Sequence, residues 1–245
     1  MTQNIIFFGD SYCASFHYVG QGNRKIPGTN QDVDAPGGHP SLVAQDLGYN
    51  LYNFGYGGKG WWYSRDMMYT YLANTPEVLE NTAAMVFFHT DPYRLLLSRS
   101  HEPHDLDYHD KVWQTGMIDH NYLCWSQSQW FLEINQRFGT VPTVHFFCYH
   151  EPTTYSQLLP GMSFISPLIH LSIGEMLGTD KQILSQIYND KRANHFNTHN
   201  NRAIADIIVQ ALANYQPGTY TIDSTKFDQP NKNAHRWPEP GHGTQ

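Results

Sequence analysis

Charged residues are scarce in this chain of 245 residues, because Asp, Glu, Lys and Arg together make up only 15% of it. The 15 Lys and Arg residues form no basic run, and the formal net charge is -7. Proteins that bind a nucleic-acid backbone need clustered cations to neutralise its phosphates. We therefore expect that nucleic acid is not a partner of this protein.

The sequence also has few cysteines and no long apolar run. Cys13, Cys124 and Cys148 lie far apart and form no C-x-x-C pair, which argues against a disulfide or zinc framework. No apolar stretch is long enough to cross a bilayer, so no membrane is expected as a partner. The first residues lack a basic region and a small-residue cleavage site, and we expect synthesis in the cytoplasm without a signal peptide.

What the sequence does contain is a series of short apolar runs in which apolar and polar residues do not alternate. They are Ile5–Phe8, Leu51–Phe54, Ala83–His89 and Val141–Tyr149. Segments 39–50, 130–138 and 201–215 lie between or after them and have the apolar spacing of helices. Such a pattern is typical of a parallel sheet covered on both faces. We predict a three-layer α/β/α sandwich with a mainly parallel sheet of about five strands, whose functional residues lie at the carboxyl ends of the strands.

A change in composition near residue 216 predicts two parts, a domain over residues 1–215 and an extended, irregular C-terminal arm over residues 216–245. The arm is rich in Pro, Gly and Asn and has few large apolar residues, namely Tyr220, Ile222, Phe227 and Trp237. We expect these residues to pack against a neighbouring subunit or against the back face of the domain. The first alternative is favoured because a segment with so few apolar residues gains most where two surfaces meet. Packing of the arm against a neighbouring subunit would make the chain part of a homo-oligomer or a larger assembly.

Polar and glycine-rich residues follow the predicted strands in a recognisable order. The first strand ends in Gly9-Asp10-Ser11, and the second leads into "NFGYGG", residues 53–58. The third is followed by "TDPYR", residues 90–94, and "RANHFNTHNN" precedes the last helix. These four blocks resemble those of the SGNH (GDSL-type) hydrolases, a family named for a Ser, a Gly, an Asn and a His. The resemblance runs from residue 5 to about residue 214 and implies a flavodoxin-like α/β fold.

The resemblance implies a set of catalytic roles. Ser11 is the nucleophile and His195 is the general base. The N–H groups of Ser11 and Gly58 are oxyanion donors, with Thr90 standing where the family has Asn. A serine needs such a base and such donors to attack an ester, and no cofactor or metal is required.

The group that orients the imidazole of His195 differs from the family. Arg192 stands at the position of the usual acid. A backbone carbonyl near residue 192 could accept the Nδ1–H of His195, and Asp190 is the nearest alternative carboxylate. Both alternatives stay open in the sequence.

Several other residues have two interpretations. His199 competes with His195 as the base, although the spacing favours His195. Trp61 and Trp62 could stack against a sugar or belong to the core or a subunit contact. Arg94 could bind an acidic substrate, but pairing with Asp91 is the expected role.

The predicted function is ester hydrolysis through an acyl-Ser11 intermediate, with carbohydrate O-acetyl esters or small acyl esters as substrates. The alternative is a non-catalytic structural or receptor-binding subunit of a viral particle, such as a phage tail or virion protein, with a vestigial site. This alternative draws on the altered blocks that contain Thr90 and Arg192, which are similar to those of virus-borne members of the family. A third reading is a metal-dependent hydrolase that uses the histidines of segment 101–109, for which a solvated loop is the expected structure.

Overall fold

The computed structural model describes residues 2–10, 12–13, 38–55, 60–89, 120–148, 167–170, 196, 198–222 and 224–227. Its centre is a six-stranded sheet in the order β2-β1-β3-β4-β5-β6, and every neighbouring pair is parallel. The strands are β1 (Asn4–Phe8), β2 (Asn50–Asn53), β3 (Thr82–His89), β4 (Thr143–Phe147), β5 (Pro167–His170) and β6 (Gly218–Thr221). This is the flavodoxin-like strand order with one strand added at the end. The predicted α/β class with a parallel sheet is confirmed.

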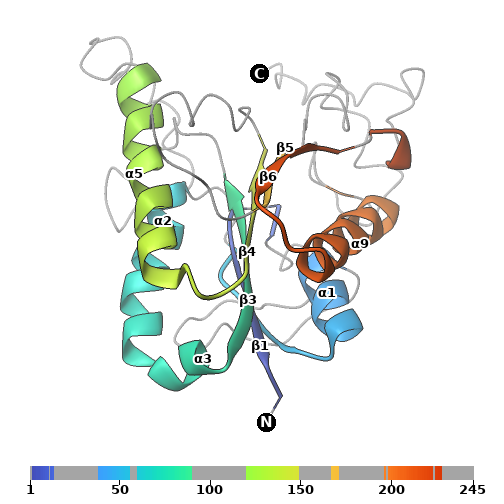
Figure 1. Cartoon of the computed structure of the whole chain (residues 1–245), viewed down its shortest axis with the longest axis horizontal. Coiled ribbons are helices and arrows are strands. Elements are labelled where there is room, and N and C mark those ends of the chain that lie inside the picture. The colour runs from blue at the N-terminus through green and yellow to red at the C-terminus, as the bar shows by residue number, and fades with distance from the viewer. Residues whose placement is uncertain are drawn as a thin grey trace, which may run out of the picture.

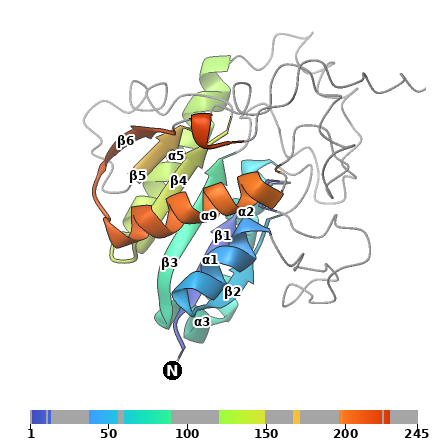
Figure 2. The same ribbon diagram turned by 90° about the vertical axis from the view of Figure 1, so that its right-hand side faces the viewer.

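Helices cover both faces of the sheet (Figure 1). One face carries α1 (His39–Leu47) and α9 (Thr198–Ala213), which lie in front of the sheet when the view is turned (Figure 2). The other face carries α2 (Trp61–Thr70), α3 (Pro76–Glu80) and α5 (His120–Phe138). The single turn η1 (Leu72–Asn74) joins α2 to α3. These are the two outer layers of the predicted sandwich.

Alternate residues of the central strands enter two separate cores, one beneath each helical layer. Ile5 and Phe7 of β1 pack with α1 and α9, whereas Ile6 and Phe8 pack with α2 and α5. All five residues of β1 are buried. Because the central strands are covered on both faces, their sequences are mostly apolar and do not alternate with polar residues.

The helices end and pack as their sequences predict. α1 ends before Gly48, which has the left-handed conformation with φ 66° that glycine adopts without steric cost. In α5, Trp130, Phe131, Ile134 and Phe138 are all buried on the face that meets the sheet. None of the described helices has the length and apolar character needed to cross a membrane.

The predicted irregular arm does not begin at residue 216. Residues Gly218–Thr221 form β6 and pair with β5, and the turn η2 (Ser224–Lys226) follows. Phe227 is buried in the core that lies beneath α1 and α9, and Ile222 packs against that core. These two apolar residues are therefore anchored in the chain's own domain. Trp237 and the rest of 228–245 lie outside the described residues.

Candidate active site

The carboxyl ends of β1, β2 and β3 bring three polar residues to one edge of the sheet. Asp10 follows β1, Asn53 ends β2 and His89 ends β3, and all three side chains are buried. In doubly wound sheets this edge is where ligands bind. The candidate site is therefore built from the loops that leave this edge.

A tight turn follows β1 and is held by hydrogen bonds from Tyr12 and Cys13 to Asp10. The backbone N–H of Tyr12 donates to the Asp10 carboxylate (3.0 Å), and the N–H of Cys13 donates to the Asp10 carbonyl oxygen (3.1 Å). Gly9 has to be small here, because an added Cβ would lie 2.9 Å from both Cys13 Sγ and Phe88 Cβ. In the first block, Gly9 thus allows close packing and Asp10 holds the turn.

Asn53 ties the turn after β1 to the glycine loop after β2. Its Nδ2 donates to the carbonyl oxygen of Cys13 (2.9 Å), and its Oδ1 accepts from the backbone N–H of Gly55 (2.9 Å). Asn53 is only 2% exposed. A buried amide with both ends satisfied holds its two neighbours at a fixed separation.

Cys13 is the other nucleophilic side chain near position 11, and its surroundings keep it inert. Burial raises the pKa of the Cys13 thiol well above its usual value, and the neighbouring Asp10 and Cys148 raise it further. Because the thiolate is the reactive form, Cys13 stays protonated and is a poor nucleophile. Its sulfur lies 3.7 Å from the Phe8 carbonyl oxygen, within the core.

Phe196 brings the block before α9 to the turn after β1. Its ring centroid lies 5.3 Å from that of Tyr12 and 5.9 Å from that of His39. Tyr12 and Phe196 are both buried, at 4% exposure each. These residues directly follow Ser11 and His195 in the chain, so the immediate sequence neighbours of the two candidate catalytic residues are in contact.

A buried pair, His39 and Asn201, lies beside Phe196 and joins α1 to α9. Asn201 Oδ1 is 3.0 Å from both the backbone nitrogen and Nδ1 of His39, and Asn201 Nδ2 donates to the Phe196 carbonyl oxygen (3.1 Å). Burial lowers the pKa of His39 to about 4, partly opposed by the hydrogen bond to Asn201. The imidazole is therefore neutral near pH 7.

A second buried pair, His89 and His145, lies on the opposite face, beneath α5. His89 Nε2 and His145 Nδ1 are 2.8 Å apart, and the rings stack at 5.1 Å. Burial lowers the pKa of His145 to about 3; burial, and then the neighbouring His145, lower that of His89 well below its usual value. Whichever ring donates, no described residue is a hydrogen-bond partner for His89 Nδ1 or His145 Nε2.

The two candidate stacking tryptophans differ in their surroundings. Trp61 begins α2, is 3% exposed, and packs on Trp130 in the core beneath α5. Trp62 is half-buried, stacks on Trp61 at 3.9 Å between centroids, and has the Arg65 guanidinium 5.7 Å from its ring. The sequence left three roles open for Trp61, and in the structure it is part of the core.

Six predicted site residues lie outside the described residues: Ser11, Gly58, Thr90, Arg94, Asp190 and His195. Arg192 and the histidines of segment 101–109 also lie outside them. Within the described part of the chain, no group of three or more His, Cys, Asp or Glu side chains could hold a metal ion. His199, the alternative base, is exposed on α9, and its Nε2 is 3.3 Å from the carbonyl oxygen of Lys226 in η2.

His39, Asn201 and the His89–His145 pair were not predicted from the sequence. His39 and Asn201 are 162 positions apart, and no local pattern links them. A signal for His145 was available, since it interrupts the apolar run of β4 at the position that faces α5 rather than α9. Each of these residues acts through a contact that only the tertiary fold creates.

Comparison with known proteins gives structural likenesses at low sequence identity. No protein-family model matches the chain, and no curated protein sequence matches it. A lipase/acylhydrolase from Enterococcus faecalis is 13% identical, with a TM-score of 0.48 over 89% of this chain and 100% of that one. A GDSL-like lipase from Parabacteroides merdae is 10% identical, with a TM-score of 0.47 over 86% of this chain and 96% of that one.

A carbohydrate esterase described as having divergent catalytic and non-catalytic binding functions is similar to the same degree. It is 9% identical, with a TM-score of 0.45 over 86% of this chain and 65% of that one. Likenesses at this level do not transfer an activity, because one fold hosts many functions.

Proposed function

We propose that this protein is a serine ester hydrolase that acts through an acyl-Ser11 intermediate, with His195 as the general base. The observation that carries the proposal is the contact between Tyr12 and Phe196, whose ring centroids are 5.3 Å apart. A nucleophile and its base must come within hydrogen-bond reach. Buried packing between the residues that directly follow Ser11 and His195 in the chain supports this pairing.

Two further contacts support the proposal. Asn53 bonds both Cys13, two residues after position 11, and Gly55, three residues before position 58. His89 ends β3 directly before position 90, at the same edge of the sheet. The three proposed oxyanion donors, the N–H groups of Ser11 and Gly58 and the hydroxyl of Thr90, therefore belong to loops that leave one sheet edge.

The proposed reaction has two steps, acylation and deacylation, and needs only these residues and water. Ser11 Oγ attacks the ester carbonyl carbon while His195 takes the hydroxyl proton, and the oxyanion is held by the three donors. Collapse breaks the bond to the alcohol, which leaves with the proton from His195. Water, deprotonated by His195, then attacks the acyl-Ser11 ester, and the acid is released with Ser11 restored.

The substrate class and the orienting group complete the proposal. Carbohydrate O-acetyl esters or small acyl esters are the proposed substrates, on the basis of the resemblance of the four blocks. With Arg192 at the usual acid position, Asp190 or a backbone carbonyl holds the His195 tautomer. One Thr hydroxyl in place of an Asn amide weakens the oxyanion site, since losing a donor altogether costs about 100- to 1000-fold.

The test is phosphonate labelling of the full chain, followed by peptide mapping and by p-nitrophenyl acetate turnover. Ser11 should be the labelled residue, Ser11→Ala should abolish turnover, and His195→Ala should lower it roughly 100-fold or more. His199→Ala is the matched control, because its ring meets Lys226 in η2, and it should retain activity.

Three outcomes would contradict the proposal. They are labelling at another residue, full activity of Ser11→Ala, and loss of activity in His199→Ala but not in His195→Ala. A chain that folds but is neither labelled nor active would instead favour the non-catalytic alternative suggested by Thr90 and Arg192. That role, as a structural or receptor-binding subunit of a viral particle, is the competing prediction.

A further inference from the structure

Asn201 is buried at 4% exposure in the first turn of α9, and its side chain can be oriented without ambiguity. A backbone N–H can only donate, so the His39 N–H identifies the nearer Asn201 atom as Oδ1. A backbone carbonyl can only accept, so the Phe196 carbonyl oxygen identifies the other as Nδ2. Both ends of the amide are thus assigned by groups that have one hydrogen-bonding role.

The assignment also determines the tautomer of His39. Asn201 Oδ1 cannot donate, so the Nδ1 of His39, 3.0 Å away, must carry the proton. The Nε2 is then an unprotonated acceptor, is buried, and has no hydrogen-bond partner among the described residues. The His39 ring packs at 4.8 Å on Phe88 and edge-on to Phe196 at 5.9 Å.

Phe196 is therefore held in two ways. Its carbonyl oxygen accepts from Asn201, and its ring lies between Tyr12 and His39. Tyr12 is in turn fixed by the bond of its N–H to the Asp10 carboxylate. One continuous set of buried contacts runs from the start of α1, through Asn201 and Phe196, to the turn after β1.

We propose that Asn201 is a positioning residue for catalysis, which through His39 and the Phe196 carbonyl sets the separation between the Ser11 turn and the His195 segment. The proposal rests on the proposed function, in which these two residues react together. Asn201 touches no reacting atom. Its effect should therefore fall on the chemical step and leave substrate binding largely unchanged.

The decisive variant is Asn201→Asp, which keeps the shape of the side chain. One carboxylate oxygen still accepts from His39, but the other replaces the amide donor and faces the Phe196 carbonyl oxygen. Two oxygens in this position repel each other, so the variant breaks one contact and retains the other. Asn201→Ala removes both.

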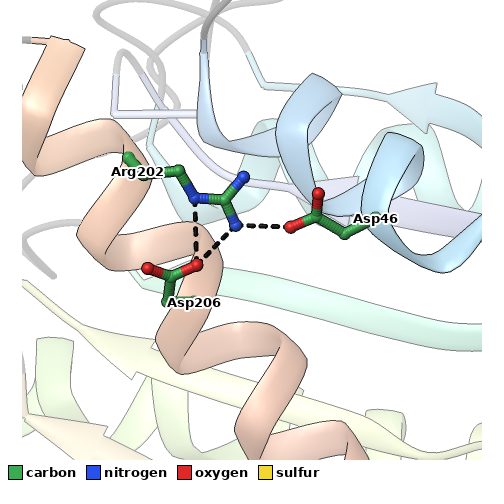
Figure 3. Close-up of polar contacts among 3 residues, drawn as sticks. All are labelled: Asp46, Arg202 and Asp206. Atoms are coloured by element: carbon green, nitrogen blue, oxygen red, sulfur yellow. Dashed lines mark hydrogen bonds and ion pairs between the residues drawn. The ribbon is translucent and has the colours of Figure 1, made fainter.

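The matched controls act on the same two helices and leave the hydrogen bonds of Asn201 to His39 and Phe196 in place. Ile208→Val removes a methyl group from the buried face of α9 and reports a simple loss of stability. Arg202→Met breaks the exposed contacts of Arg202 with Asp46 of α1 and with Asp206, which lie at the surface of the α1–α9 contact (Figure 3).

For p-nitrophenyl acetate, Asn201→Asp and Asn201→Ala should each lower kcat by roughly 10- to 100-fold, because a shift of about 1 Å in a catalytic group can cost this much. KM should change less than about twofold, and both controls should keep the parental kcat. A parental kcat for Asn201→Asp would overturn the proposal. So would an equal loss of kcat in Ile208→Val, which would show that any destabilisation of α9 suffices.

Phosphonate labelling of the parental chain at Ser11 decides the proposed function separately. If the parental chain is inert, amide hydrogen exchange still decides the inference about Asn201. Exchange in the peptides around residues 12–13 and 196–199 should rise in Asn201→Asp and stay at the parental level in Ile208→Val. Unchanged exchange in Asn201→Asp would overturn the proposed positioning.

Discussion

Replacing His145 by phenylalanine should change how the stability of the protein depends on pH. Burial lowers the pKa of His145 to about 3 and that of His39 to about 4, and it is also the main cause that lowers the pKa of His89. The usual value for a histidine is 6.5. All three imidazoles are therefore neutral in the folded protein at mildly acidic pH, whereas in the unfolded chain they are protonated.

The sign of the effect follows from the direction of these shifts. Above pH 6.5 neither state binds a proton at these histidines, and their contribution to stability is fully present. As the pH falls below 6.5 the unfolded chain binds protons that the folded protein does not, so the free energy of unfolding decreases. Each histidine contributes about 1.4 kcal/mol per pH unit, which amounts to about 2 kcal/mol between pH 7 and pH 5.

Three such histidines together lower the free energy of unfolding by about 6 kcal/mol over this range, out of a total of about 5–15 kcal/mol for a typical domain. Few carboxylates titrate between pH 5 and pH 7, so the histidines dominate the slope. The His145→Phe variant should lose the part of the slope that comes from His145, which is about one third of the sum over these three histidines. Its free energy of unfolding should fall by about 2 kcal/mol less than that of the parental chain.

The assay is urea unfolding, followed by circular dichroism, at pH 7, 6, 5.5 and 5. Phe138→Leu is the matched control, because Phe138 is buried in the same core on α5 and carries no titratable group. It should lower the free energy of unfolding by a similar amount at every pH and keep the parental slope. A parental slope in His145→Phe would refute the reasoning, since it would mean that folding does not keep this imidazole neutral.

Two further predictions concern residues outside the histidine pairs. Gly9→Ala should lower the free energy of unfolding by about 1–3 kcal/mol, because the new Cβ would lie 2.9 Å from Cys13 Sγ and Phe88 Cβ in a packed core; a melting temperature equal to the parental one would contradict this. Arg202→Met should change it by less than about 1 kcal/mol, because the ion pair with Asp46 is exposed, and any loss should shrink further at high salt. Calorimetry at two salt concentrations measures the second effect.

The central strands could be predicted from the sequence because their burial on both faces leaves a local trace. β1, β3 and β4 are mostly apolar, and each was predicted within two residues of its observed ends. The helix that ends before Gly48 was also predicted, since its terminator is a single residue in the left-handed conformation. In these elements the signal in the sequence is carried by residues that are close together in the chain.

β6 and the His39–Asn201 pair could not be predicted, for a common physical reason. β6 has the sequence Gly-Thr-Tyr-Thr and forms because β5 offers unpaired backbone groups, which leave no mark in the sequence of β6 itself. The amide of Asn201 is likewise paired with groups that are distant in the chain. The sequence could place Trp61 either in the core or on the surface, since only the position of α5 decides between them.

The position of β6 affects how well this edge of the sheet is protected from pairing with another chain. Without a further strand, β5 would present an open edge of unpaired backbone groups that could pair with another chain. β6 is the last strand in the described part of the chain, and it covers β5 with only four residues that carry no aliphatic side chain. Pro217, directly before it, lacks the N–H that would extend such pairing. A short, polar final strand of this kind opposes edge-to-edge aggregation of the finished protein.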